Sequence, residues 1–313
     1  GGERFHGAFA FNPASQIAAR FLDADPEAEI GAEWFAGKLA RAMKLRDFSG
    51  QSHGRLVHAE GDGLPGLVID LYGSVAAVQP NAAWVDARLD PLIEALLAAG
   101  LGVETVVVNA ASRVRALEGL GSEVRVAAGS LDAPVEVKMN GAIYLADLLQ
   151  GQKTGLFYDQ RCNHAFAAAR ARGSVLDVFA HAGGYGLACL AAGATRVVAV
   201  DSSAAALELA REGARRMGVE AAYETRKADA FAAMGEAASA GETFDLVICD
   251  PPAFAPSKAA LDQGLRAYEK TARLAARLVA PGGWLVLCSC SGAVSAEALR
   301  AASVKGIRAA GRM

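Results

Sequence analysis

The segment Phe244-Asp-Leu-Val-Ile-Cys-Asp-Pro-Pro-Ala-Phe254 is an apolar run that ends in an acid, two prolines and an aromatic residue. A run of this length and composition indicates a central parallel strand. The strand must end at Asp250, because neither Pro251 nor Pro252 can donate a hydrogen bond to a neighbouring strand. In open α/β sheets, ligands bind at the carboxyl ends of the strands. We therefore expect Asp250 and Phe254 to meet a flat ligand there.

From Gly151 onward, on both sides of this segment, short apolar runs alternate with stretches whose apolar residues recur at helical spacing. Such alternation predicts a Rossmann-like, doubly wound α/β fold with a parallel sheet. We expect strands at Val175–Phe179, Arg196–Asp201, Tyr223–Lys227, Phe244–Cys249 and Trp284–Cys290. We expect helices at residues 160–172, 185–192, 203–217 and 259–279.

Residues 50–147 have a different pattern of short β-rich runs and helical segments, which predicts a small α+β domain. β-rich runs between residues 55 and 79 are broken by glycine-containing turns, which indicates a meander. A hairpin is expected at residues 135–146, because Asn140 and Gly141 both tolerate the positive φ of a type I′ turn. The remaining expected elements are an amphipathic helix at 32–46, a helix at 84–99 and a strand at 103–109.

Length and composition limit the kinds of protein that the chain can be. At 313 residues with 53% hydrophobic residues, it can form two domains of about 100–200 residues each. No apolar run approaches the roughly 20 residues of a membrane span and no signal segment opens the chain, so we expect a soluble, cytoplasmic protein. The net charge of −3 lacks the positive field of most nucleic-acid binders, and RNA binding would require a local basic patch. The cysteines lack C-x-x-C spacing, and no metal is expected.

A glycine-rich loop follows the first of the expected parallel strands. Val175–Phe179 leads into Ala180-His-Ala-Gly-Gly-Tyr-Gly186, whose glycines let the backbone approach a ligand, while the N–H groups of the next helix favour a polar or anionic group. The following strand ends in Asp201, 24 residues after Asp177, where Rossmann-like folds bind a ribose diol. These features predict an adenosine-type cofactor, contacted by Asp177, Phe179, Gly183, Asp201 and Ser202.

Two further segments bear on the identity of this cofactor. Asp229 follows the expected third strand, and its carboxylate can accept a hydrogen bond from an adenine amino group beside Ala230 and Phe231, or can simply cap a helix. The glycine loop by itself does not separate S-adenosylmethionine from a nicotinamide cofactor. The Asp250-Pro-Pro-Ala-Phe254 turn favours S-adenosylmethionine, because a base-modifying enzyme needs an acceptor and an aromatic surface beside the methyl donor.

Five ordered motifs give a more specific indication than any one of them. They are Gly151-Gln-Lys-Thr-Gly-Leu-Phe-Tyr-Asp-Gln-Arg161, Asp177-Val-Phe-Ala-His-Ala-Gly-Gly184, Val200-Asp-Ser-Ser203, Asp250-Pro-Pro-Ala-Phe254 and Ser289-Cys-Ser-Gly292. In this order they resemble the large-subunit ribosomal RNA cytosine-C5 methyltransferase family, over residues 50–300. The resemblance implies S-adenosylmethionine as cofactor, ribosomal RNA as partner, and a cofactor pocket lined by Tyr158, Gln160 and Arg161.

The resemblance also implies a PUA domain, a central α+β domain and a C-terminal Rossmann-like methyltransferase domain. Residues 1–28 then correspond to a C-terminal remnant of the PUA domain, because residues 8–22 resemble only its last strands. Residues 29–150 form the linker helix and central domain. Residues 151–313 form the methyltransferase domain, without the antiparallel strands that normally complete its sheet.

Cytosine C5 is a poor nucleophile until a group adds at C6, and a cysteine thiolate is suited to that addition. Cys290 is the candidate nucleophile, because it lies at the carboxyl end of an expected strand beside the Asp250 strand. Cys288 lies deeper on the same strand, and Cys249 is expected to be buried. Asp250 would contact the base and, when protonated, donate to N3. Further substrate contacts are expected from Pro251, Pro252, Phe254 and Lys258.

Several alternatives stay open at this point. Lys258, Arg266 and Tyr268 are able to contact RNA phosphate or to form an ordinary solvated helix face. An amino-group or guanine-N7 methyltransferase would use the same turn without Cys290, a nicotinamide-dependent dehydrogenase would share the glycine loop, and a non-catalytic RNA-binding factor would keep only the fold. The target nucleotide, the group that removes the C5 proton and the oligomeric state are not encoded in these patterns.

Overall fold

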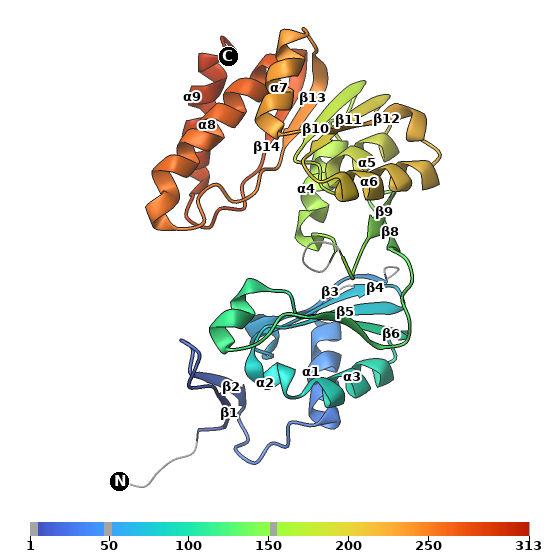
Figure 1. Ribbon diagram of the computed structural model, residues 1–313, viewed down its shortest axis with the longest axis vertical. Helices are drawn as coiled ribbons and strands as arrows, with labels where there is room; N and C mark the ends of the chain where they lie inside the picture. Colours follow the sequence, from blue (N-terminus) through green and yellow to red (C-terminus); the bar gives the residue numbers. More distant parts are fainter. Residues whose placement is uncertain (1–5, 47–51, 151–154, 313) are drawn as a thin grey trace. The chain divides into compact units, whose positions relative to one another are not determined.

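The computed structural model describes residues 6–46, 52–150 and 155–312 (Figure 1). It divides into two compact units. The N-terminal unit comprises Gly1–Val137 and Ala146–Tyr158, and the C-terminal unit comprises Lys138–Leu145 and Asp159–Met313. Residues 151–154, which begin the first of the five motifs, lie outside the described residues.

A five-stranded sheet in the order β3-β4-β5-β6-β7 forms the centre of the N-terminal unit. The strands span His53–His58, Leu67–Tyr72, Val75–Pro80, Thr105–Asn109 and Val124–Ala128. β3, β4 and β5 are antiparallel neighbours, so the expected meander is confirmed. β6 runs parallel to β5, because the chain between them crosses over through α2 (Ala83–Asp86) and α3 (Leu89–Ala98).

The helical segment between β5 and β6 differs from the single helix expected at 84–99. It divides into α2 and α3, with a break at Ala87 and Arg88. Pro91 explains the break, because its ring has no N–H to donate to the carbonyl four residues earlier and is tolerated only in the first turn of a helix. The expected amphipathic helix is confirmed as α1 (Ala32–Lys44), whose buried face packs with that of α3.

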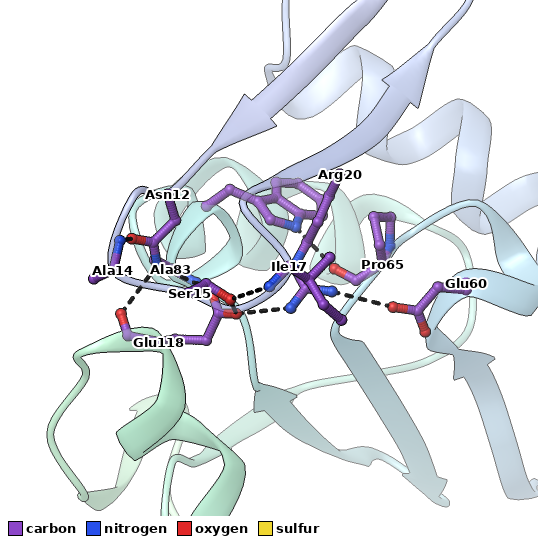
Figure 2. Close-up of polar contacts among 10 residues, drawn as sticks. Asn12, Ala14, Ser15, Ile17, Arg20, Glu60, Pro65, Ala83 and Glu118 are labelled. Carbon is purple, nitrogen blue, oxygen red and sulfur yellow. Dashed lines mark hydrogen bonds and ion pairs between the residues drawn. The ribbon is translucent and has the colours of Figure 1, made fainter.

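Glu118 joins the N-terminal hairpin, β1 (Ala8–Phe11) and β2 (Ala19–Asp23), to the rest of its unit (Figure 2). The residue is 6% exposed. It accepts hydrogen bonds from Asn12 Nδ2 (3.1 Å), Ser15 Oγ (2.5 Å), Arg20 Nη2 (2.7 Å) and the Ala83 N–H (3.2 Å). Burial acts to raise the pKa of Glu118, but these bonds outweigh it and lower the pKa to about 2. Glu118 is therefore a structural carboxylate that stays ionised.

The expected hairpin of β8 (Val135–Met139) and β9 (Ala142–Ala146) is confirmed. Its two turn residues have φ values of 53° and 75°, as a type I′ turn requires. The tip of the hairpin belongs to the C-terminal unit, where the Tyr144 hydroxyl donates to the Gly184 carbonyl at 3.1 Å. The chain therefore passes between the two units at this hairpin as well as at Tyr158.

A five-stranded parallel sheet in the order β12-β11-β10-β13-β14 forms the centre of the C-terminal unit, as predicted. In chain order the strands are β10 (Ser174–Val178), β11 (Arg196–Asp201), β12 (Tyr223–Lys227), β13 (Phe244–Cys249) and β14 (Val279–Leu287). The direction of strand addition reverses between β10 and β13. This reversal creates a topological switch point, where ligands bind in doubly wound sheets.

Helices cover both faces of this sheet (Figure 1). On one face lie α5 (Gly184–Ala191) and α6 (Ala204–Arg216), with α4 (Arg161–Ala168) packed on α5. On the other face lie α7 (Ala230–Ser239) and α8 (Leu261–Leu278), with α9 (Ala296–Ala309) packed on α8. Sequence reasoning did not predict α7 or α9. Among the helices in the described ranges, none is long and apolar enough to cross a membrane.

Candidate active site

The ends of β10, β13 and β14 bring the expected catalytic segments together. The Asp250 N–H donates to the Val178 carbonyl of β10 at 3.3 Å. On the other side of β13, the Cys288 N–H donates to the carbonyl of the last β13 residue at 2.9 Å. The Cys290 thiol then reaches the Pro251 carbonyl at 3.8 Å. The expected nucleophile therefore contacts the residue directly after Asp250.

β14 ends at Leu287, before the expected end at Cys290. The chain leaves the sheet where two serines bond to α8: the Ser289 hydroxyl donates to the Tyr268 hydroxyl at 2.7 Å, and the Ser291 hydroxyl lies 2.8 Å from the same group. The side chain of Cys290, between them, is exposed. Tyr268 itself is only 3% exposed, so the expectation that it contacts RNA phosphate is wrong.

The structure distinguishes the three cysteines near the strand ends. Cys249 is fully buried, and burial raises the pKa of its thiol well above the usual value. Cys288 is half-buried with its sulfur 3.2 Å from the Tyr185 hydroxyl, and burial raises the pKa of Cys288 to about 11. Both thiols are therefore held in the unreactive protonated form. Cys290 is the exposed member of the three.

Asp250 is suited to exchange a proton near neutral pH. Burial, with a smaller contribution from the negative charge of Asp159, raises the pKa of Asp250 to about 6. A carboxyl group with such a pKa is present in both protonation states at physiological pH, which suits general acid–base catalysis.

Only some side chains of the Asp250-Pro-Pro-Ala-Phe254 turn are accessible to a ligand. Pro251 is buried, so the expected substrate contact of its ring is not supported, and its carbonyl faces Cys290 instead. Pro252 and Lys258 are exposed. Phe254 is half-buried in an aromatic cluster. Its ring centroid lies 4.9 Å from that of Tyr268, 6.2 Å from that of Phe231 and 6.4 Å from that of Phe179.

The glycine loop after β10 is held in an unusual backbone conformation. Phe179, His181 and Gly183 have φ values of 65°, 47° and 81°. The first two lack glycine's freedom, and such strain is kept where the surrounding structure fixes it, often at functional sites. The Asp201 carboxylate supplies that fixation, because it accepts from the His181 N–H at 2.9 Å and from the Ser203 N–H at 2.8 Å.

Position 183 requires glycine both because its φ is positive and because a side chain there would clash with its neighbours. A Cβ atom there would lie 2.8 Å from the Tyr223 hydroxyl and 2.9 Å from the Ala210 Cβ. Asp177 lies fully buried beneath the loop and accepts from the Gly186 N–H at 2.8 Å. Burial raises the pKa of Asp177 to about 7. The expectation that Asp177 contacts the cofactor directly is not supported, because its carboxylate shapes the loop from below.

The remaining expected cofactor residues have varied surroundings. The Tyr158 hydroxyl donates to the Leu71 carbonyl at 2.8 Å within the N-terminal unit. Gln160 Oε1 accepts from the Tyr185 hydroxyl at 3.2 Å, and Asp229 Oδ1 accepts from the Ala232 N–H at 3.0 Å as the N-cap of α7. Arg161 begins α4, Ser202 is exposed, and Ala230 is buried. The cap role of Asp229 is thus realised, and the cofactor roles of this group stay predictions.

Comparison with known proteins identifies the family. A family model described as S-adenosylmethionine-dependent methyltransferase matches residues 120–308. The chain belongs to this methyltransferase family. It is similar to the ribosomal RNA large subunit methyltransferase I of Shewanella frigidimarina, with 36% identity over 297 residues that cover 92% of this chain and 74% of the relative.

Solved structures show the same fold. A SAM-dependent methyltransferase from Streptococcus mutans has a TM-score of 0.79 and 18% identity, over 96% of this chain and 78% of that chain. The methyltransferase SMU.776, complexed with SAH, also has a TM-score of 0.79 and 18% identity, over 96% and 79% of the two chains. The α/β fold is therefore confirmed, and the nicotinamide-dependent dehydrogenase is excluded by family membership.

S-adenosylmethionine is the cofactor of this methyltransferase, and the glycine loop fits it. The loop comes close to α6 because Gly183 lacks a side chain, and the Asp201 carboxylate lies beside it at the end of β11. Phe179 and Phe231, whose ring centroids are 6.4 Å apart, add an apolar surface for a flat ring. When bound, the sulfonium group supplies an electrophilic methyl group.

Sequence reasoning missed Tyr185 as a member of the site, and it assigned Tyr268 to an RNA contact or a solvated helix face instead. The signal for Tyr268 was present, because Gly264, Tyr268 and Thr271 recur at helical spacing on the buried face of α8. Besides Gln160, the Tyr185 hydroxyl contacts Cys288, which is far away in the sequence, and no local pattern joins Tyr185 to Cys288.

Proposed function

We propose that this methyltransferase acts on large-subunit ribosomal RNA and forms 5-methylcytosine, with Cys290 as nucleophile and Asp250 as the acid that assists at the base. The observation that carries the proposal is the exposed Cys290 thiol in contact with the Pro251 carbonyl, next to a carboxyl group whose pKa is raised to about 6. The names of relatives such as the Shewanella frigidimarina protein support ribosomal RNA as the substrate. A ribosomal substrate in turn supports a cytoplasmic location.

The proposed reaction begins with addition of the Cys290 thiolate to C6 of cytosine. The electron pair of the C5–C6 double bond moves toward N3, where the protonated Asp250 donates its proton. The resulting enamine carbon, C5, takes the methyl group as its bond to the donor sulfur breaks. Loss of the C5 proton then restores the C5–C6 double bond and expels Cys290 as a thiolate, and N3 returns its proton to the Asp250 carboxylate.

The target base must leave its stack in this reaction. C5 and C6 have to meet the methyl donor and the thiol at the same time, which a paired base inside a helix does not allow. Phe254 and Pro252, at the turn after Asp250, are proposed to face the extruded base. Lys258 and Arg266, both exposed, are proposed to contact the phosphate backbone and to supply the local basic character that the net charge lacks.

The test uses a large-subunit ribosomal RNA transcript that contains 5-fluorocytidine. Fluorine at C5 cannot leave as a cation, so the covalent adduct accumulates. We expect an adduct with the wild type and none with Cys290→Ala, measured by denaturing gel shift and peptide mass spectrometry. Cys288→Ala is the matched control and should keep the adduct, because its thiol is held protonated beside Tyr185. An adduct that survives Cys290→Ala would show that Cys290 is not the nucleophile. Methyl transfer without any adduct would favour an amino-group or guanine-N7 methyltransferase instead.

A further inference from the structure

Three hydroxyl groups connect the segment around Cys290 to α8 and to the turn after Asp250. The Ser289 hydroxyl donates to the Tyr268 oxygen at 2.7 Å. The proton of Tyr268 is therefore free to donate to the Ser291 oxygen, 2.8 Å away. Ser291 also accepts from the Ala255 N–H at 3.0 Å, and its own N–H donates to Ser289 Oγ at 3.2 Å. The two neighbours of Cys290 are thus tied to one phenol.

The ring of Tyr268 completes this arrangement. Its centroid lies 4.9 Å from that of Phe254, at the tip of the turn that begins with Asp250. Tyr268 and Ser291 are 3% and 5% exposed, so water does not compete for these bonds. Cys290, by contrast, is exposed, and its thiol makes only a weak contact with the Pro251 carbonyl. The position of the sulfur therefore depends on its neighbours rather than on its own packing.

We infer that Tyr268 is a positioning residue that holds the Cys290 sulfur and the Phe254 ring in a fixed mutual geometry. This inference rests on the proposed function only for its catalytic consequence. A nucleophile must approach C6 along a defined direction, and small displacements of a reacting atom reduce the rate strongly. Tyr268 touches neither the base nor the methyl donor in this scheme. It acts through Ser289, Ser291 and Phe254.

Tyr268→Phe is the decisive variant, because it keeps the ring against Phe254 and removes only the hydroxyl. In single-turnover reactions with the 5-fluorocytidine transcript, we expect the rate of adduct formation to fall roughly 10- to 100-fold, while the RNA concentration that half-saturates the rate stays unchanged. Thr271→Val is the matched control. Thr271 lies on the same helix, is equally buried, and donates only to the Ala267 carbonyl of its own helix.

A second readout does not depend on RNA. Iodoacetamide labels exposed thiols, and peptide mass spectrometry gives the labelling rate of Cys290 relative to that of Cys162, which is also exposed and lies on α4. We expect Tyr268→Phe to raise this ratio several-fold, because the sulfur is no longer held against the Pro251 carbonyl. Thr271→Val should leave it unchanged.

The outcomes separate the two proposals. If wild type forms no adduct but Tyr268→Phe raises the labelling ratio, the cytosine-C5 reaction is wrong and the positioning role stands. If wild type forms the adduct and Tyr268→Phe matches it in both rate and labelling, the positioning role is wrong. The positioning role is also wrong if Thr271→Val reproduces both effects, because a general loss of stability then explains them. As a further check, Tyr268→Phe combined with Ser289→Ala should be no slower than Tyr268→Phe alone, since both changes break one network.

Discussion

The two units treat buried carboxylates in opposite ways. In the N-terminal unit, Glu118 is surrounded by donors, and its pKa is lowered to about 2 in spite of burial. In the C-terminal unit, burial raises the pKa of Asp250 to about 6 and that of Asp177 to about 7. A carboxylate with satisfied donors stabilises a fold, whereas one kept short of donors is available to a ligand or a proton. The raised pKa values of these two carboxyl groups indicate that the catalytic site lies in the C-terminal unit.

A similar contrast separates the other charged pairs of the N-terminal unit from the site. Asp70 is fully buried and accepts from Arg55 Nε at 2.9 Å and Nη2 at 3.0 Å, and Asp62 accepts from Arg46 Nη1 at 2.8 Å and Nη2 at 2.6 Å. Paired geometry of this kind fixes neighbouring strands and helices. At the carboxyl ends of β10 and β13, by contrast, Asp250 lies among Cys288, Tyr185 and Asp177, none of which is a cation.

The largest expected effect is that of Asp250→Asn on methyl transfer. The amide cannot deliver the proton to N3, and we expect the transfer rate to fall roughly 10²- to 10⁴-fold. The thermal unfolding temperature should not fall, since the variant removes a half-buried carboxylate that has no cationic partner among the described residues. Transfer is measured with radiolabelled donor and ribosomal RNA. Loss of stability together with activity would show that Asp250 is structural, like Glu118.

The converse is expected of Glu118→Gln. The amide loses the charge that binds Arg20 and leaves buried donors partly unsatisfied, so we expect the free energy of unfolding to fall by about 3 kcal/mol. The transfer rate per folded molecule should be unchanged. Urea unfolding measures the first quantity. Glu123→Gln is the control: Glu123 lies in the same unit, is exposed and contacts Arg125 only at 3.8 Å, so it should change stability by less than about 0.5 kcal/mol.

The sheet of the C-terminal unit could be predicted because its signals are local. Buried parallel strands read as continuous apolar runs, and β11 and β13 begin and end where expected. β12 also has the expected bounds, although it is a mostly polar edge strand. α7 and α9 were missed although both are rich in alanine, the residue with the highest helix propensity. The end of β14 was placed too late, because bonds from Ser289 and Ser291 to α8 draw the chain out of the sheet.

The sequence predicted which residues form the site better than it predicted what each residue does. Asp250 and Cys290 follow from strand ends, which a sequence shows. Their surroundings do not, because Tyr185 contacts Cys288 and Tyr268 contacts Ser289 from helices elsewhere in the chain. The hydrogen bonds of Glu118 could not be predicted for the same reason, since they join residues about a hundred positions apart.

The glycine loop offers a smaller and sharper test within the C-terminal unit. Gly183→Ala forces a Cβ atom onto the Tyr223 hydroxyl and a backbone φ of 81° onto alanine, which together cost about 2 kcal/mol or more of unfolding free energy. Gly218→Ala is the control: its φ is 73°, but nothing lies within 4 Å of the added Cβ, so only the backbone strain of about 1 kcal/mol applies. We expect calorimetry to show weaker SAH binding for Gly183→Ala alone. Equal binding by both variants would remove the loop from the cofactor site.

The smallest expected effect is a change in the pH dependence of stability, which tests the contrast between Glu118 and Asp177. Asp177 titrates near 7 in the folded state and near 3.8 when unfolded, so its stabilising contribution is complete below pH 3.8 and is lost as pH rises toward 7. Glu118 has the opposite sign: its contribution is complete above its unfolded pKa of 4.5 and is lost only as pH falls toward 2. Between pH 6 and pH 7 Glu118 is therefore silent, and we expect urea unfolding to show a loss of about 1 kcal/mol that Asp177→Asn reduces. Identical pH profiles for wild type and Asp177→Asn would mean that the buried carboxylates of the two units are not different in kind.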